Sequence, residues 1–87
     1  MKLIAIGFGN YVSAQRIVAV VSQDSAPVRR IIQDTKERGS LVDASFGRKT
    51  QSVLIMDSGH VILSALPPDK INARLEEILD EGDAEDE

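Results

Sequence analysis

The segment at residues 25–39, SAPVRRIIQDTKERG, constrains the fold most, because its period and both of its ends specify a single helix. Four residues at positions i, i+3, i+4 and i+7 form one stripe that has to be buried, and we expect a sheet to cover it; they are Val28, Ile31, Ile32 and Thr35. Ser25 is a favourable N-cap, and Pro27 is tolerated in the first turn, where its missing N–H has no intrahelical partner. Gly39 directly after Arg38 predicts the end of the helix.

The length of the chain allows one domain with one hydrophobic core, since it has 87 residues. Only 3% of the residues are aromatic, so the core has to be aliphatic, and we expect association between copies to add stability. The absence of cysteine fits a reducing compartment, and we expect the cytoplasm. No apolar run approaches the ~20 residues that cross a bilayer, so no membrane contact is expected.

Four other segments have the composition of strands: residues 2–7, 17–21, 52–56 and 61–65. The loop DSGH at residues 57–60 has turn chemistry, so it predicts that the last two segments form an antiparallel hairpin. Residues 7–10 predict a turn, residues 41–46 a short extended piece, and residues 47–50 a polar loop.

A second helix is predicted from Pro67 and Pro68 to Gly82, because apolar residues recur there at helical spacing. The resulting element order is ββαββα. This order indicates the α+β class, with a small, mostly antiparallel sheet and two helices.

The charges are unevenly distributed along the chain. All ten Lys and Arg but only six of the fourteen acids fall in residues 1–75, which gives that part a net charge of +4. Residues 76–87 hold the other eight acids and no base, a net charge of −8. We therefore predict a basic domain at residues 1–80 and a disordered acidic tail at residues 81–87.

No group of residues has the spacing that catalysis, a cofactor or a metal requires. Gly7 and Gly9 lack the third glycine of a dinucleotide-binding motif, and Arg48 interrupts the spacing of a phosphate-binding P-loop. His60 is the only histidine, so a cluster of imidazoles is impossible. The sequence predicts neither an enzyme nor a bound cofactor or metal.

The candidate functional residues are the basic ones in and around the first helix: Arg16, Arg29, Arg30, Lys36, Arg38, Arg48 and Lys49. Arg48 and Lys49 are the strongest candidates, because adjacent cations behind a glycine have no local acid and can reach a phosphate backbone. Arg30 lies four residues before Asp34, and Arg38 lies in the last turn, so each either stabilises the helix or contacts a ligand. Such cations suit DNA or an acidic protein partner. An enzyme that acts on a small phosphorylated ligand is a third alternative.

Four stretches together resemble the RemA family, named for the bacterial extracellular matrix regulatory protein A: GFGNYVSAQRIV from Gly7, SQDSAPVRRIIQDTKERG, LVDASFGRKT and DSGHVILSA. The resemblance extends from about residue 2 to residue 75. It implies a cytoplasmic, DNA-binding transcriptional regulator that activates biofilm matrix genes. It also implies a closed homo-oligomeric ring, octameric in the known form, with double-stranded DNA bent around its basic rim.

The resemblance assigns DNA contact to Arg16 and Arg48, and to Lys49, where the family has an arginine. Lys49 keeps the charge but not the planar fork that binds phosphate in a bidentate way. We add Arg29 to the predicted contacts, and we interpret Pro27, which matches a functionally important proline, as architectural. A ring repeats these few contacts and makes the later ones intramolecular. Recognition through DNA backbone and shape is expected.

Overall fold

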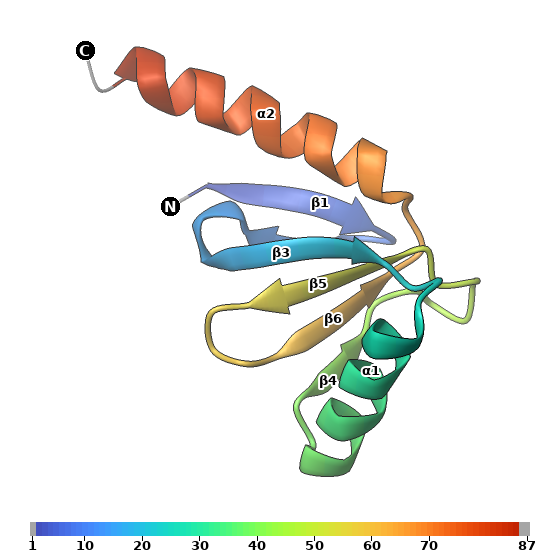
Figure 1. The fold of residues 1–87 in the computed structure, drawn as a ribbon. Helices are drawn as coiled ribbons and strands as arrows, with labels where there is room; N and C mark the ends of the chain where they lie inside the picture. Colours follow the sequence, from blue (N-terminus) through green and yellow to red (C-terminus); the bar gives the residue numbers. More distant parts are fainter. Residues whose placement is uncertain (1, 86–87) are drawn as a thin grey trace.

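The structure, a computed structural model, describes residues 2–85 and the side chains of residues 2–78. Figure 1 shows strands in the centre, with one helix along the upper side and one below. The elements are β1 (Leu3–Gly7), β2 (Asn10–Ser13), a 3-10 turn (Ala14–Arg16), β3 (Ile17–Ser22), α1 (Ala26–Arg38), β4 (Leu41–Asp43), β5 (Ser52–Met56), β6 (Val61–Ser64) and α2 (Pro68–Glu85). The α+β class is confirmed. No helix in the described part of the chain is long and apolar enough to cross a membrane.

The strands form two sheets rather than one. β1 and β2 make an antiparallel pair, and the other sheet has the order β3-β5-β6-β4 with β4 parallel to β6. The predicted hairpin of β5 and β6 is confirmed. The sequence did not predict β2, because Val12 is its only buried residue and its pattern is too short to stand out.

The first helix begins and ends as its sequence predicts. The Ser25 hydroxyl accepts a hydrogen bond from the Val28 N–H at 3.4 Å, and Gly39 ends the helix with φ +76°. Three residues of the predicted stripe, Val28, Ile31 and Ile32, pack in one cluster with Val53, Val61 and Leu63 of β5 and β6. α1 is therefore fixed on one face of the larger sheet.

A second core cluster lies between β1, β2, β5, α2 and the start of the β4–β5 loop, and it contains Ile4, Ile6, Val12, Ala44, Leu54 and Ile71. The buried Ser64 hydroxyl donates to the Ile6 carbonyl at 2.7 Å, and this bond joins the two sheets. An Arg74 guanidinium nitrogen donates to the Ala5 carbonyl at 2.5 Å and ties α2 to β1. Figure 1 shows α2 extending along β1.

The prediction that Gly82 ends the second helix was wrong, because α2 continues through Gly82 to Glu85. One glycine inside a helix costs only about 1 kcal/mol relative to alanine, whereas a proline would stop the helix. The division at residue 80 into a domain and an acidic tail stays a prediction. Residues 86 and 87 of that tail lie outside the described residues.

Candidate nucleic-acid interface

The loop between β4 and β5 carries two of the predicted contacts, Arg48 and Lys49, and both side chains are exposed. Lys49 lines a shallow hollow together with Ser22, Gln23 and Asp24, the residues that connect β3 to α1. Arg29 is exposed in the first turns of α1, directly after this connection. Arg29, Arg48 and Lys49 therefore lie at one end of the larger sheet, which we call the basic end.

Arg16 lies at the opposite end of that sheet. Ile17 pairs with Met56 and Ser22 pairs with Ser52, so β3 extends along the whole of β5 between Arg16 and the basic end. At about 3.3 Å per residue, this separation is roughly 17 Å. One subunit does not bring Arg16 and Arg48 together.

Arg16 has a weak ionic partner. Its Nη1 lies 3.3 Å from Oδ2 of Asp57, and the Arg16 side chain remains 69% exposed. Exposed pairs of this kind contribute about 0–1 kcal/mol, so Arg16 can exchange Asp57 for a phosphate at little cost. Pro27 lies exposed in the first turn of α1, where its ring fixes the backbone. The roles of all these residues stay predictions.

Two exposed phenylalanines that the sequence did not single out lie beside Arg48. The rings of Phe8 and Phe46 stack with centroids 5.4 Å apart, and the Arg48 guanidinium carbon lies 5.8 Å from the Phe8 centroid. Phe46 is 77% exposed and Phe8 is 49% exposed. We call these two residues the aromatic pair. The signal in the sequence is a Phe-Gly step in each of two segments, GFGN, for which a turn is predicted, and SFGR, where the predicted extended piece meets the polar loop.

The backbone of the aromatic pair is strained. Phe8 and Phe46 both have φ +55°, a conformation that bulky residues rarely adopt, and each precedes a glycine that also has a positive φ. A residue held in this way costs on the order of 1–3 kcal/mol, and such strain often marks a functional site. The strain therefore lowers the free energy of unfolding, while two apolar rings stay exposed to solvent.

Hydrogen bonds fix both loops that carry the pair. The Asn10 side-chain amide donates to the Gly7 carbonyl at 3.0 Å and to the Ala44 carbonyl at 3.4 Å, so it links the β1–β2 turn to the β4–β5 loop. Oδ1 of Asp43 accepts from the backbone N–H of Ser45 at 3.0 Å and from its hydroxyl at 2.5 Å. These bonds from Ser45 hold the pKa of Asp43 below its usual value. The aromatic pair is therefore preorganised.

Comparison with known proteins gives the family. Residues 3–75 match the RemA-like family, described as extracellular matrix regulatory protein A-like. The chain belongs to the RemA-like family. The extracellular matrix regulatory protein A of Bacillus subtilis is 54% identical over 85 residues, which cover 94% of this chain and 96% of that protein.

Other relatives match most or all of this chain. A protein of Dictyoglomus turgidum named as a regulatory protein is 56% identical over 87 residues, 100% of this chain and 98% of its own. Another, from Acetivibrio thermocellus, is 61% identical over 75 residues, 86% of this chain and 81% of its own. The RemA-like match includes Arg16, Pro27, Arg48 and the aromatic pair, and it ends before the most acidic segment.

Proposed function

We propose that this chain is a DNA-binding transcriptional regulator of the matrix-gene type that acts as a homo-oligomeric ring. Arg16, Arg48 and Lys49, with Arg29, contact the DNA backbone, and Pro27 shapes the start of α1. Regulatory names among the relatives support the regulatory role, and the exposed cations support the ligand.

The observation that carries the proposal is the state of the cations at the basic end. In the part of the chain that the structure describes, no ion pair joins Arg29, Arg48 or Lys49 to a carboxylate. Their charges are therefore available to phosphate oxygens, which receive half to two-thirds of protein–DNA hydrogen bonds.

A single subunit would bind weakly, because it offers few phosphate contacts. Arg16 and the basic end are roughly 17 Å apart along β3, so the two ends contact different phosphates. Repetition in a closed ring makes the later contacts intramolecular and raises the affinity without any new kind of contact. The proposed DNA binding therefore depends on the proposed ring.

The test is the affinity for a fluorescent DNA duplex, measured by anisotropy at several salt concentrations. We expect Arg16→Ala and Arg48→Ala to weaken binding and to make the log–log salt slope shallower by about 0.9 per lost phosphate contact and engaged subunit. Lys70→Ala is the matched control, since it removes one exposed charge on α2 that is not a candidate DNA contact. Unchanged affinity in both arginine variants, with the mass preserved, would exclude the proposed contacts.

A second candidate function is a protein-interaction module whose basic loop binds acidic partners. The aromatic pair beside Arg48 favours it, because exposed phenyl rings are typical of protein interfaces. Competition separates the two candidates. A DNA regulator releases its labelled duplex to unlabelled duplex far more readily than to polyglutamate, whereas the interaction module shows the reverse order.

A further inference from the structure

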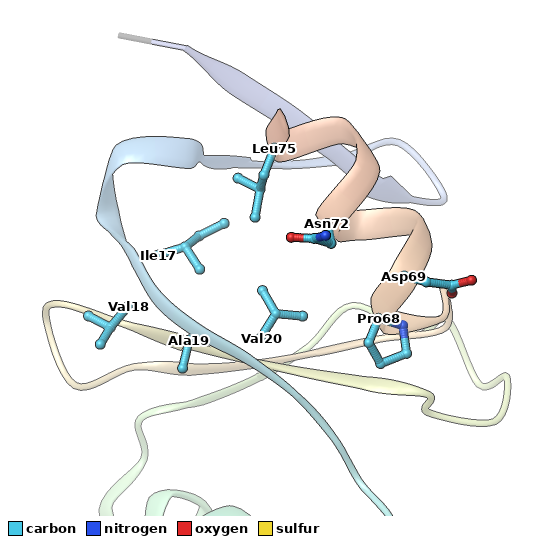
Figure 2. A pocket seen from close by; sticks show the side chains of 8 residues that line it. All are labelled: Ile17, Val18, Ala19, Val20, Pro68, Asp69, Asn72 and Leu75. Atoms are coloured by element: carbon cyan, nitrogen blue, oxygen red, sulfur yellow. The ribbon is translucent and has the colours of Figure 1, made fainter. Parts of the chain in front are cut away.

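An apolar groove opens between β3 and the first turns of α2, with a cavity volume of about 430 Å³. Its lining consists of Ile17, Val18, Ala19, Val20, Pro68, Asp69, Asn72 and Leu75. Figure 2 shows Ile17, Val20 and Leu75 pointing toward one another inside it. These three side chains also pack against the core, so the floor of the groove is continuous with the hydrophobic interior.

The strand that borders the groove lacks protection against association. β3 is at the edge of its sheet and pairs only with β5 among the described strands. Its sequence, IVAVVS, contains no charged residue and no proline, the devices that usually protect an edge strand. Val18 at this edge is 66% exposed. A covering surface is therefore expected here.

The same chain carries an apolar projection elsewhere, the aromatic pair at the basic end. Its two rings expose roughly 250 Å², given that a phenylalanine can bury about 150–250 Å². A stable interface needs about 800 Å² from each partner, so the pair is the anchor of a contact and not the whole of it.

The charges next to the two surfaces are complementary. Arg48 and Lys49 flank the aromatic pair, and Asp69 lies at the rim of the groove. Figure 2 shows the Asp69 carboxylate pointing away from the groove floor, and its only hydrogen bond in the described residues is to the Lys70 backbone N–H at 3.0 Å. Opposite charges at the edge of an apolar contact fix its orientation.

We infer that the aromatic pair of one copy inserts into the β3–α2 groove of the next copy, with the loop cations facing Asp69. The two surfaces lie on different parts of the chain, so the contact is head to tail and leads to a ring where the rotation closes. The inference rests on the homo-oligomeric part of the proposed function. The inserted rings take no part in the proposed DNA contacts, whereas Arg48 and Lys49 lie at the rim of the contact and are also proposed to bind phosphate. This contact would explain the backbone strain at Phe8 and Phe46, because the strained conformation keeps both rings exposed in the orientation that inserts into the groove.

Two charge-introducing variants test this contact by light scattering. Phe46→Glu in the pair and Val18→Glu in the groove should each weaken the contact at least about 30-fold, the effect of removing an interface hot spot. At micromolar concentration each variant then has the 9.5 kDa mass of one chain. Val42→Glu is the matched control, because Val42 is 47% exposed on β4, the opposite edge of the sheet. Far-ultraviolet circular dichroism verifies that all three variants fold.

Mixing the two variants makes the test specific. The Phe46→Glu chain retains an intact groove and the Val18→Glu chain an intact aromatic pair, so an equimolar mixture should give the mass of two chains and no more. A folded mixture that remains at the mass of one chain would refute the head-to-tail contact. The contact would also be refuted if the wild-type protein has the mass of one chain, or if either variant still forms oligomers.

The readouts also separate this inference from the DNA proposal. If the wild type, the variants and their mixture have the expected masses but the wild type binds no duplex, the interface is supported and the proposed DNA-binding function is refuted. A Phe46→Glu chain that keeps its full oligomeric mass overturns the interface, whether or not it binds the duplex.

Discussion

At the scale of residues, the proposed DNA-binding cations differ in the side chain that each already contacts. Arg16 is paired with Asp57, whereas Arg48 lies over the Phe8 ring. The difference has consequences for binding, since Asp57 competes with any phosphate for Arg16 and a phenyl ring offers little competition to an anion.

Asp57→Asn should therefore strengthen DNA binding. The substitution frees Arg16 and removes a negative charge that an approaching duplex meets, so we expect about a twofold to fivefold gain in affinity, the equivalent of an exposed ion pair. Anisotropy titration at low salt measures it. Asp34→Asn, which removes a charge on the exposed face of α1, is the control, and an equal gain in both variants would argue against a specific role for Asp57.

Asp43 predicts a pH dependence for the loop that carries Phe46. Because hydrogen bonds from Ser45 lower the pKa of Asp43 in the folded state, they stabilise the fold above the unfolded-state pKa, near 3.8. That contribution is lost as the pH falls through the folded-state value. Thermal melts from about pH 6 down to about pH 3 should show wild type losing its advantage over Asp43→Asn only below about pH 4. A constant difference across this range would contradict the assignment.

At the scale of elements, the sequence predicted what local chemistry determines. α1 was predictable to both ends, because Ser25 and Gly39 act within one turn of the backbone that they satisfy. β2 was not predictable, because only one of its four residues, Val12, is buried. The division into two sheets was not predictable either, because it depends on contacts between residues distant in the sequence, such as Ser64 and Ile6. The aromatic pair was missed for the same reason: Phe8 and Phe46 meet only after folding.

The hydrogen bond between Ser64 and Ile6, which joins the two sheets, predicts that removal of one hydroxyl group lowers the stability of the fold. Ser64→Ala leaves the buried Ile6 carbonyl and the Leu66 N–H without the hydroxyl that serves both, which should cost about 1–3 kcal/mol of unfolding free energy. Urea denaturation gives the value. Ser58→Ala, in the exposed β5–β6 loop, is the control and should stay within about 0.5 kcal/mol of wild type. Equal stabilities of the two variants would contradict the role of Ser64.

At the scale of the whole molecule, opposite charges collect on separate parts of one chain. The domain that carries the proposed DNA contacts is basic over residues 1–75, while residues 76–87 carry a net charge of −8. In an oligomer every copy holds its acidic segment at high effective concentration near the cations of its neighbours. We therefore propose that this segment competes with DNA for those cations.

Removal of residues 81–87 should therefore strengthen DNA binding, by about tenfold at low salt and less at high salt. The deletion removes five of the eight acids in that region, and their field is screened over about 10 Å at 0.1 M salt. Titration of both chains against one duplex at two salt concentrations measures the effect. Because the deletion also shortens α2, a full-length chain with the same five acids replaced by their amides is the control and should bind as tightly as the deletion. If all three chains bind equally at both salt concentrations, the acidic segment has no part in recognition, and the balance between basic domain and acidic end serves solubility alone.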